Sequence, residues 1–86
     1  MYFVYILKSE RDGSYYTGSA ENALIRLIRY NAGWSRSTKG KRPWRIVHTE
    51  TYATKKESLR REREIKQMES RVYIERLINR AGSRPE

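Results

Sequence analysis

The 86-residue sequence contains no cysteine and a single histidine. Disulfide bonds and thiolate metal sites are therefore excluded, and one histidine cannot build a zinc site by itself. No stretch approaches the roughly 20 apolar residues of a membrane-spanning helix, and the first residues, MYFVYILK, lack the basic segment and cleavage site of a secretory signal. From these absences we expect a cytoplasmic protein that does not insert into a membrane.

Acidic residues are also scarce: 10 Asp and Glu stand against 19 Lys and Arg, a formal charge of +9. This excess on a short chain favours a polyanionic partner, and nucleic acid is the first candidate. Anionic membrane surfaces and acidic proteins are the alternatives. With 37% hydrophobic residues at periodic positions, the chain can build one modest core, so we expect a single folded domain.

Two strand-forming runs near the N-terminus flank a polar turn. Residues 2–8 are apolar on both faces, which is typical of a central strand, and residues 15–18 form a shorter second run. The turn chemistry of Asp12-Gly13 joins them, so the pattern predicts a β-hairpin. In the simplest symmetric register, Tyr5 lies directly opposite Tyr16 and the two phenols are neighbours on one face.

A helix is predicted over residues 22–31, with Asn22 as its N-cap. Its apolar residues at core-facing spacing are Leu24, Leu27 and Ile28. Arg26 and Tyr30 are four residues apart, so they share a face that is turned away from the apolar stripe and free to point into a groove. Ile25 beside the stripe enlarges an apolar strip, which indicates a protein partner or a weak dimer through this helix.

A basic loop, SRSTKGKRPW, follows at residues 35–44. The cations in and just after it are Arg36, Lys39, Lys41, Arg42 and Arg45. We expect this loop to grip phosphate groups, which would position a nucleic acid without reading its sequence, and a merely solvated loop is the alternative. Residues 44–52 then predict a third strand, in which His48 is an ordinary strand residue.

A second helix is predicted over residues 54–68, because Thr54 begins the capping box T-K-K-E. Helical spacing places Glu62 midway between Leu59 and Ile65, on the side that faces the sheet. A carboxylate at such a position is costly unless it is paired, hydrogen-bonded or bound to a cation. We therefore expect Glu62 to have a partner, either another side chain or a bound cation.

A third helix begins at residue 71. Its packing stripe consists of Tyr73, Ile74, Leu77 and Ile78. The order strand, strand, helix, strand, helix, helix predicts an α/β (α+β) domain in which three helices pack with a small antiparallel three-stranded sheet. We assign this domain to residues 1–80 and a disordered C-terminal tail to residues 81–86.

The tripeptide VYI at residues 4–6, followed by YTG at 16–18, resembles the paired tripeptides of the GIY-YIG nuclease family. Arg26, the segment STKGKRPW at 37–44 and the segment REREIK at 61–66 follow in the family's order. The resemblance covers roughly residues 1 to 78. It is closest to small stand-alone bacterial members, and it supports the predicted architecture.

The resemblance implies distinct roles for five residues at a catalytic site. It assigns Tyr5 and Tyr16 to the nucleophile side, Arg26 to the scissile phosphate, and Glu62 to a single divalent cation, Mg²⁺ or Mn²⁺. Which phenol accepts the proton stays open; Tyr5 is favoured, with Tyr16 orienting the water or the phosphate. Tyr30 stands where many members carry a histidine, so it is assigned as a hydrogen-bonding partner of Tyr5 or as a weak base.

The implied function is a metal-dependent endonuclease that hydrolyses phosphodiester bonds, with DNA favoured over RNA as substrate. No further domain that could select a site is recognised in the sequence, so low intrinsic sequence specificity is expected. The competing interpretation is a non-catalytic nucleic-acid-binding module of the same fold. A basic RNA-associated accessory domain explains the charge but leaves the inward-facing Glu62 without a role.

Overall fold

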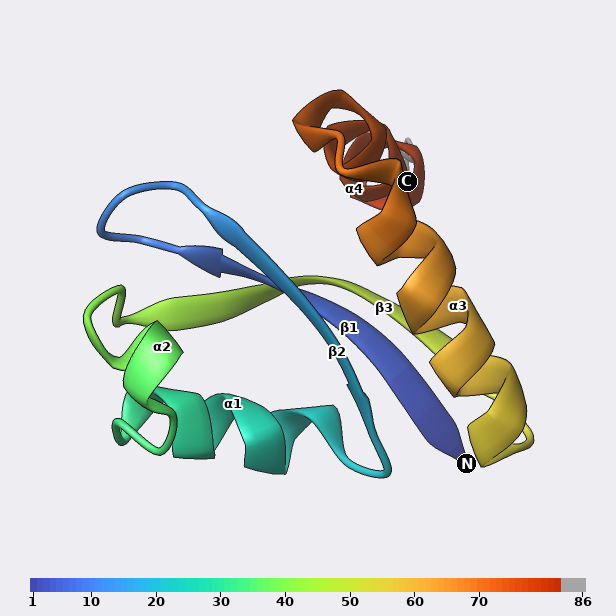
Figure 1. Cartoon of the computed structure of the whole chain (residues 1–86), viewed down its shortest axis with the longest axis horizontal. Coiled ribbons are helices and arrows are strands. Elements are labelled where there is room, and N and C mark those ends of the chain that lie inside the picture. The colour runs from blue at the N-terminus through green and yellow to red at the C-terminus, as the bar shows by residue number, and fades with distance from the viewer. Residues whose placement is uncertain (83–86) are drawn as a thin grey trace.

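Three antiparallel strands form one sheet with the order β2-β1-β3, and helices cover it on both sides (Figure 1). The computed structural model describes residues 1–82. Its elements are β1 (Tyr2–Ser9), β2 (Tyr15–Ala20), α1 (Ala23–Asn31), α2 (Arg36–Lys39), β3 (Trp44–Tyr52), α3 (Lys55–Met68) and α4 (Arg71–Gly82). The predicted α+β fold class and the order of its main elements are confirmed. The addition is α2, a single helical turn within the segment that was expected to be a loop.

Helix α4 continues through Gly82, two residues into the segment assigned to a tail, and residues 83–86 lie outside the described part of the chain. The rest of the expected tail is therefore not tested. Among the helices of residues 1–82, none combines the length and the apolar character that crossing a membrane requires.

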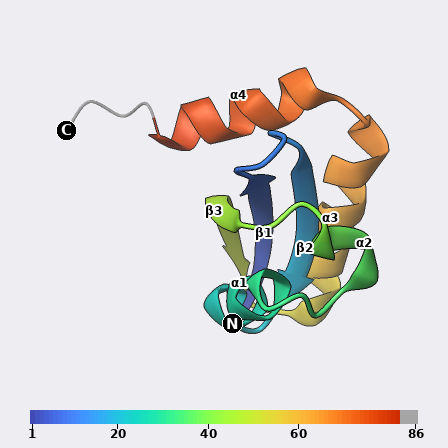
Figure 2. The same ribbon diagram turned by 90° about the vertical axis from the view of Figure 1, so that its left-hand side faces the viewer.

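Strand β1 is the centre of the molecule, as its sequence predicts. The side chains of residues 4–7 are fully buried, and alternate residues point into two different clusters. Tyr5 and Leu7 pack with Ala23, Tyr30 and Trp44 on the side of α1. On the opposite side, the cluster consists of Val4, Ile6, Ile65 and Leu77 from β1, α3 and α4. Figures 1 and 2 show α1 and α3 on the two sides of the sheet.

The register of the hairpin differs from the symmetric one that was expected. Tyr5 lies opposite Gly18, and Tyr16 lies opposite Leu7. This is a shift of two residues, so both phenols stay on the same face but are diagonal neighbours. The Tyr5 ring occupies the space above Gly18, where a Cβ atom would lie 2.5 Å from the phenol oxygen. The absence of a side chain at residue 18 is what allows this packing.

Helix α1 presents a different face to the core than its sequence suggested. Leu24 and Ile28 are 65% and 67% exposed, so two members of the expected stripe face solvent. Ala23, Leu27 and Tyr30 face the core instead. The helix offers two apolar faces, and the side that carries Tyr30 is buried because the aromatic ring packs against Tyr5 and Trp44 on the sheet.

The ends of the helices agree with the sequence signals. The Asn22 side chain accepts a hydrogen bond from the Ile25 amide at the start of α1. Thr54 and Glu57 form the complete capping box at the start of α3. Gly33 adopts a φ of 84°, the left-handed conformation that stops α1 and leads the chain to Trp34.

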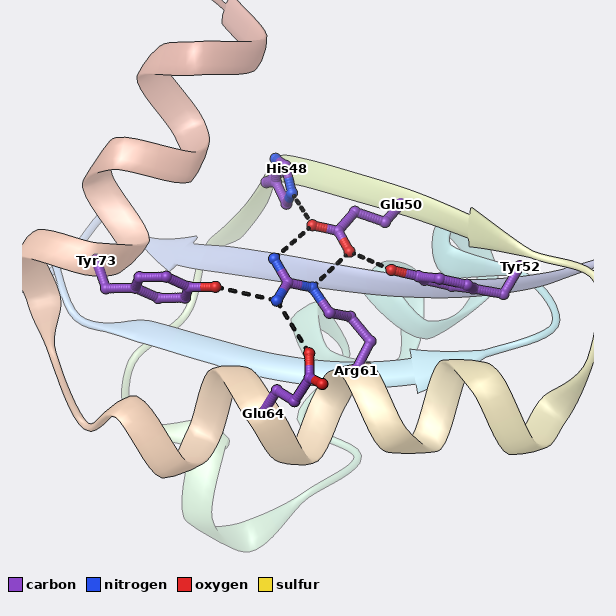
Figure 3. A network of polar contacts seen from close by, with 6 residues as sticks. All are labelled: His48, Glu50, Tyr52, Arg61, Glu64 and Tyr73. Carbon is purple, nitrogen blue, oxygen red and sulfur yellow. Dashed lines mark hydrogen bonds and ion pairs between the residues drawn. The ribbon is translucent and has the colours of Figure 1, made fainter.

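A polar network centred on Glu50 joins β3 to the two C-terminal helices (Figure 3). The Glu50 carboxylate accepts hydrogen bonds from His48, Tyr52 and Arg61, with the Arg61 Nε at 2.8 Å. Arg61 also donates to the Tyr73 hydroxyl of α4. His48, Arg61 and Tyr52 hold the pKa of Glu50 well below its usual range. The predicted ordinary strand residue His48 thus belongs to the network that fixes α3 and α4 against the sheet.

The packing of Tyr5 on Gly18 leads to a stability prediction. Gly18→Ala should lower the free energy of unfolding by about 1–3 kcal/mol, because a methyl group at residue 18 overlaps a phenol that is fully buried. Chemical denaturation measures the change. Gly40→Ala is the matched control, since nothing lies within 4 Å of a Cβ at that position. Equal stability of the two variants would contradict the packing.

Candidate active site

Tyr16, Arg26 and Tyr30 meet in a hollow between β2 and the first helix. Trp34 and Ser35 complete its lining. The rings of Tyr16 and Tyr30 pack edge to face with their centroids 5.2 Å apart, and Tyr30 makes a similar contact with Trp34 at 5.7 Å. Three of the five residues assigned to catalysis from the sequence therefore lie together at one surface.

Tyr5 lies beneath this hollow and does not line it. Its side chain is fully buried, and its hydroxyl has no hydrogen-bond partner within residues 1–82. Burial raises the pKa of the Tyr5 phenol, and the nearby Tyr30 hydroxyl and Arg26 guanidinium only partly oppose this effect. The sequence favoured Tyr5 as the proton acceptor, but in the structure Tyr16 is the phenol of the pair that faces the hollow.

All three phenols of the cluster are harder to ionise than a free tyrosine. The neighbouring Tyr30 phenol and burial raise the pKa of Tyr16, while the Lys66 ammonium lowers it. Burial likewise raises the pKa of Tyr30. The phenols are therefore neutral near pH 7, and a phenolate at this site requires additional positive charge.

Arg26 connects the tyrosine hollow to a second one, with a volume of about 690 Å³, that contains Glu62. This second hollow lies across the free edge of β2, between α1 and α3, and includes Ser19 and Ala20 of that strand. The Arg26 guanidinium lies 5.4 Å from the Trp34 ring and has no ion-pair partner in the described part of the chain. It is thus a cation available to an anion in the cleft formed by the two hollows.

Glu62 lies at the rim of this cleft with its carboxylate held on both oxygens. The Ser19 hydroxyl donates to Oε1 at 2.6 Å, and the Lys66 ammonium donates to Oε2 at 2.7 Å. The Glu62 side chain is only 18% exposed. The sequence placed Glu62 on the sheet side of α3, and the structure places it at the margin of that side, beside the edge strand.

The ligands available at Glu62 suit a hard divalent cation. Residues 1–82 contain no group of three or more His, Cys, Asp or Glu side chains arranged around a common point. A single carboxylate fits Mg²⁺ or Mn²⁺, because Mg²⁺ in particular keeps several waters and takes one or two protein carboxylates together with substrate phosphates.

The loop cations predicted to bind nucleic acid are exposed, and two of them are paired within the chain. Lys41 approaches Asp12 at 3.8 Å, and Arg45 approaches Glu10 at 3.5 Å. Arg42 donates through Nε to a backbone carbonyl of the same segment, that of residue 39. None of the five cations lines the hollows that contain Arg26 and Glu62.

Other cations do line the cleft, and sequence reasoning did not single them out. Arg29 and Lys55 share the hollow with Arg26 and Glu62, while Lys66 pairs with Glu62 itself. The spacing of four residues between Glu62 and Lys66 was a readable signal. The contact of Ser19 with Glu62 spans 43 residues of sequence, so no local pattern reveals it.

The chain matches a known domain model, that of the GIY-YIG catalytic domain. Residues 1–75 match the model of that domain, so the chain belongs to the GIY-YIG family, whose members are generally nucleases. Within the family it is similar to the UPF0213 proteins, a group of small bacterial proteins.

Three of these relatives illustrate the similarity. A UPF0213 protein of Staphylococcus epidermidis is 50% identical over 66 residues, which are 76% of this chain and 79% of that protein. One from Staphylococcus aureus is 47% identical over the same length and coverage. The solution NMR structure of a UPF0213 protein from Bacillus halodurans has a TM-score of 0.61 and 36% identity, and the match covers 95% of this chain and 87% of that one.

The positions of the cations predict which of them contribute to binding. Exchanging both Arg29 and Lys55 for glutamine should reduce the log-log salt dependence of duplex DNA binding by about 0.9 for each phosphate that the protein no longer neutralises. Exchanging both Lys41 and Arg45 removes the same charge but should change the slope less, because these cations already face carboxylates. Fluorescence anisotropy at several salt concentrations measures both slopes. A larger change of slope on exchanging Lys41 and Arg45 would indicate that the nucleic acid binds to the loop instead.

Proposed function

We propose that this protein is an endonuclease that uses a divalent cation to hydrolyse phosphodiester bonds of DNA with low intrinsic sequence specificity. The observation that carries the proposal is the position of Arg26. It lines one hollow with Tyr16 and Tyr30 and another with Glu62, so the candidate phosphate ligand lies between the phenols and the candidate cation ligand.

Hydrolysis of a phosphodiester needs a positioned water, stabilisation of charge on the phosphoryl oxygens and help for the departing oxygen. The Arg26 guanidinium suits the phosphoryl oxygens, because its planar set of donors can hold two of them at once. A phosphate held by Arg26 would lie beside the phenols, because Arg26 lines the same hollow as Tyr16 and Tyr30. A hydrogen bond from a phenol at this position would orient the attacking water.

Among the phenols, we assign the contact with water or phosphate to Tyr16. Its ring lines the cleft, whereas the Tyr5 hydroxyl is buried behind it. Tyr16 is also the phenol whose pKa is lowered by the Lys66 ammonium, although neighbouring groups raise it more. Tyr5 and Tyr30 then act by holding the Tyr16 ring in place from below and from the side.

Glu62 would hold the divalent cation, which supplies Lewis-acid stabilisation of the phosphate and of the departing oxygen when it is bound. Ser19 orients the carboxylate for this role by donating to one of its oxygens. The cleft cations Arg29 and Lys55 contact the backbone of a nucleic acid, and backbone contacts carry no sequence information. Low sequence specificity follows from such a contact set.

Nicking of supercoiled plasmid tests the proposed activity. The purified protein should convert the plasmid to the open circle in Mg²⁺ and should not do so in EDTA. Glu62→Gln should abolish nicking and leave the fold intact, because glutamine keeps the shape of the side chain but lacks the charge that a hard cation prefers. Duplex binding by this variant should persist or become tighter, since a negative charge near the phosphate is removed.

Two controls make the result interpretable. Calorimetric unfolding of Glu62→Gln establishes that a loss of nicking is not a loss of structure. Glu64→Gln is the charge control, because it removes an equal charge from an exposed position of α3 that does not line the cleft. Binding without Mg²⁺-dependent nicking by the wild-type protein would favour the non-catalytic nucleic-acid-binding module instead. A stable Glu62→Gln that still nicks would remove Glu62 from the site.

A pair of phenylalanine variants separates the two phenols. Tyr16→Phe should reduce cleavage by about 10²–10³-fold, the range typical for the loss of one positioned hydrogen-bonding group at a reaction centre. Tyr5→Phe should keep most of the activity and melt at an equal or higher temperature, because it removes a buried hydroxyl without a partner in residues 1–82. The reverse pattern of activities would give Tyr5 the role that the sequence favoured.

A further inference from the structure

Lys66 contacts both Glu62 and Tyr16, two residues that border the cleft. Its ammonium donates to Glu62 Oε2 at 2.7 Å and lies 5.8 Å from the centroid of the Tyr16 ring. The Lys66 side chain is half exposed, so its flexible stem is free to take another position. No role was assigned to Lys66 from the sequence.

The ion pair with Glu62 conflicts with the binding of a divalent cation. One oxygen of the carboxylate is engaged by the Ser19 hydroxyl, and the other is engaged by Lys66. Ser19 is neutral and leaves the charge of the carboxylate available. Lys66 is a cation, and a second cation at the same small group is repelled by it.

We propose that Lys66 is a positioning residue that holds the Glu62 carboxylate before a divalent cation binds and is displaced when the cation arrives. The proposal rests on the proposed role of Glu62 as the cation ligand. In the free protein, Lys66 balances the charge of the partly buried carboxylate and fixes its rotamer together with Ser19. Lys66 thereby lowers the affinity of the site for the cation.

The displaced ammonium has a second partner within reach. The ammonium already lies 5.8 Å from the centroid of the Tyr16 ring. Under the proposed function a phosphate of the bound strand lies near that ring, and lysine binds phosphate as a compact point charge. Cation binding thus releases a positive charge to the nucleic acid. By linkage, a strand that engages Lys66 also favours cation binding, so the site binds the cation more tightly once the strand is present.

Titration with Mn²⁺, followed by the paramagnetic broadening of backbone amide NMR signals around residue 62, tests this proposal in the absence of nucleic acid. Lys66→Gln should bind Mn²⁺ about two- to fivefold more tightly than Arg63→Gln, the range expected for the loss of one partly exposed ion pair. Arg63 is the matched control, because it lies in the same groove next to Glu62 and its loss changes the net charge equally. Lys66→Arg keeps a cation that can reach Glu62 and should bind Mn²⁺ like the wild-type protein.

The outcomes distinguish this proposal from the one on which it rests. Equal affinities of Lys66→Gln and Arg63→Gln, with binding abolished in Glu62→Gln, would overturn the role of Lys66 and leave the cation site in place. Broadening that is unchanged in Glu62→Gln, or absent around residue 62 in every variant, would overturn both. Tighter binding by Lys66→Gln together with wild-type behaviour of Lys66→Arg supports the displacement.

Discussion

The complete burial of β1 between two layers is the constraint on which the rest of this structure depends. Residues 4–7 have no exposed surface, so each face of this strand must be covered by a different set of helices. Helix α1 covers one face and α3 with α4 covers the other. The two layers approach each other along the free edge of β2, and this edge is where Arg26 and Glu62 come to share a hollow. The cleft is thus a consequence of how a very small protein covers its central strand.

The same burial shapes the chemistry of the tyrosine cluster. Tyr5 contributes its ring to the core and is shielded from solvent. Tyr16, two positions from the residue opposite Tyr5 on the paired strand, is only partly buried and lines the hollow. Burial and close packing raise the pKa values of these phenols, and the cations around them oppose that effect. A phenol in this cluster gains reactivity only when positive charge is added nearby. Under the proposed function, the divalent cation would supply this charge.

The structural features that the sequence predicted correctly share a physical basis in local contacts. The spacing of Arg26 and Tyr30 on one helix face, the capping of α1 by Asn22 and of α3 by Thr54, and the stop at Gly33 all follow from contacts over a few residues. Two predictions were wrong, the core-facing side of α1 and the register of the hairpin, because local sequence allows two equally good arrangements in each case. Helix α1 has two apolar faces, and the hairpin has two registers that keep Tyr5 and Tyr16 on one face of the sheet. The packing of Tyr30 in the core selects the face of the helix, and the packing of Tyr5 on the paired strand selects the register.

The sequence by itself determined the class of fold, the order of its main elements and the residue types available for catalysis, because these depend on periodicity, turn chemistry and composition. Only the tertiary structure decided which phenol faces the cleft, which cations line it and what holds Glu62. Ser19 lies 43 residues from Glu62, and the pairing of Lys41 with Asp12 or of Arg45 with Glu10 depends on how the hairpin meets the loop. Such contacts join segments that are distant in the chain, and their geometry is set by the packing of the whole core rather than by any local preference.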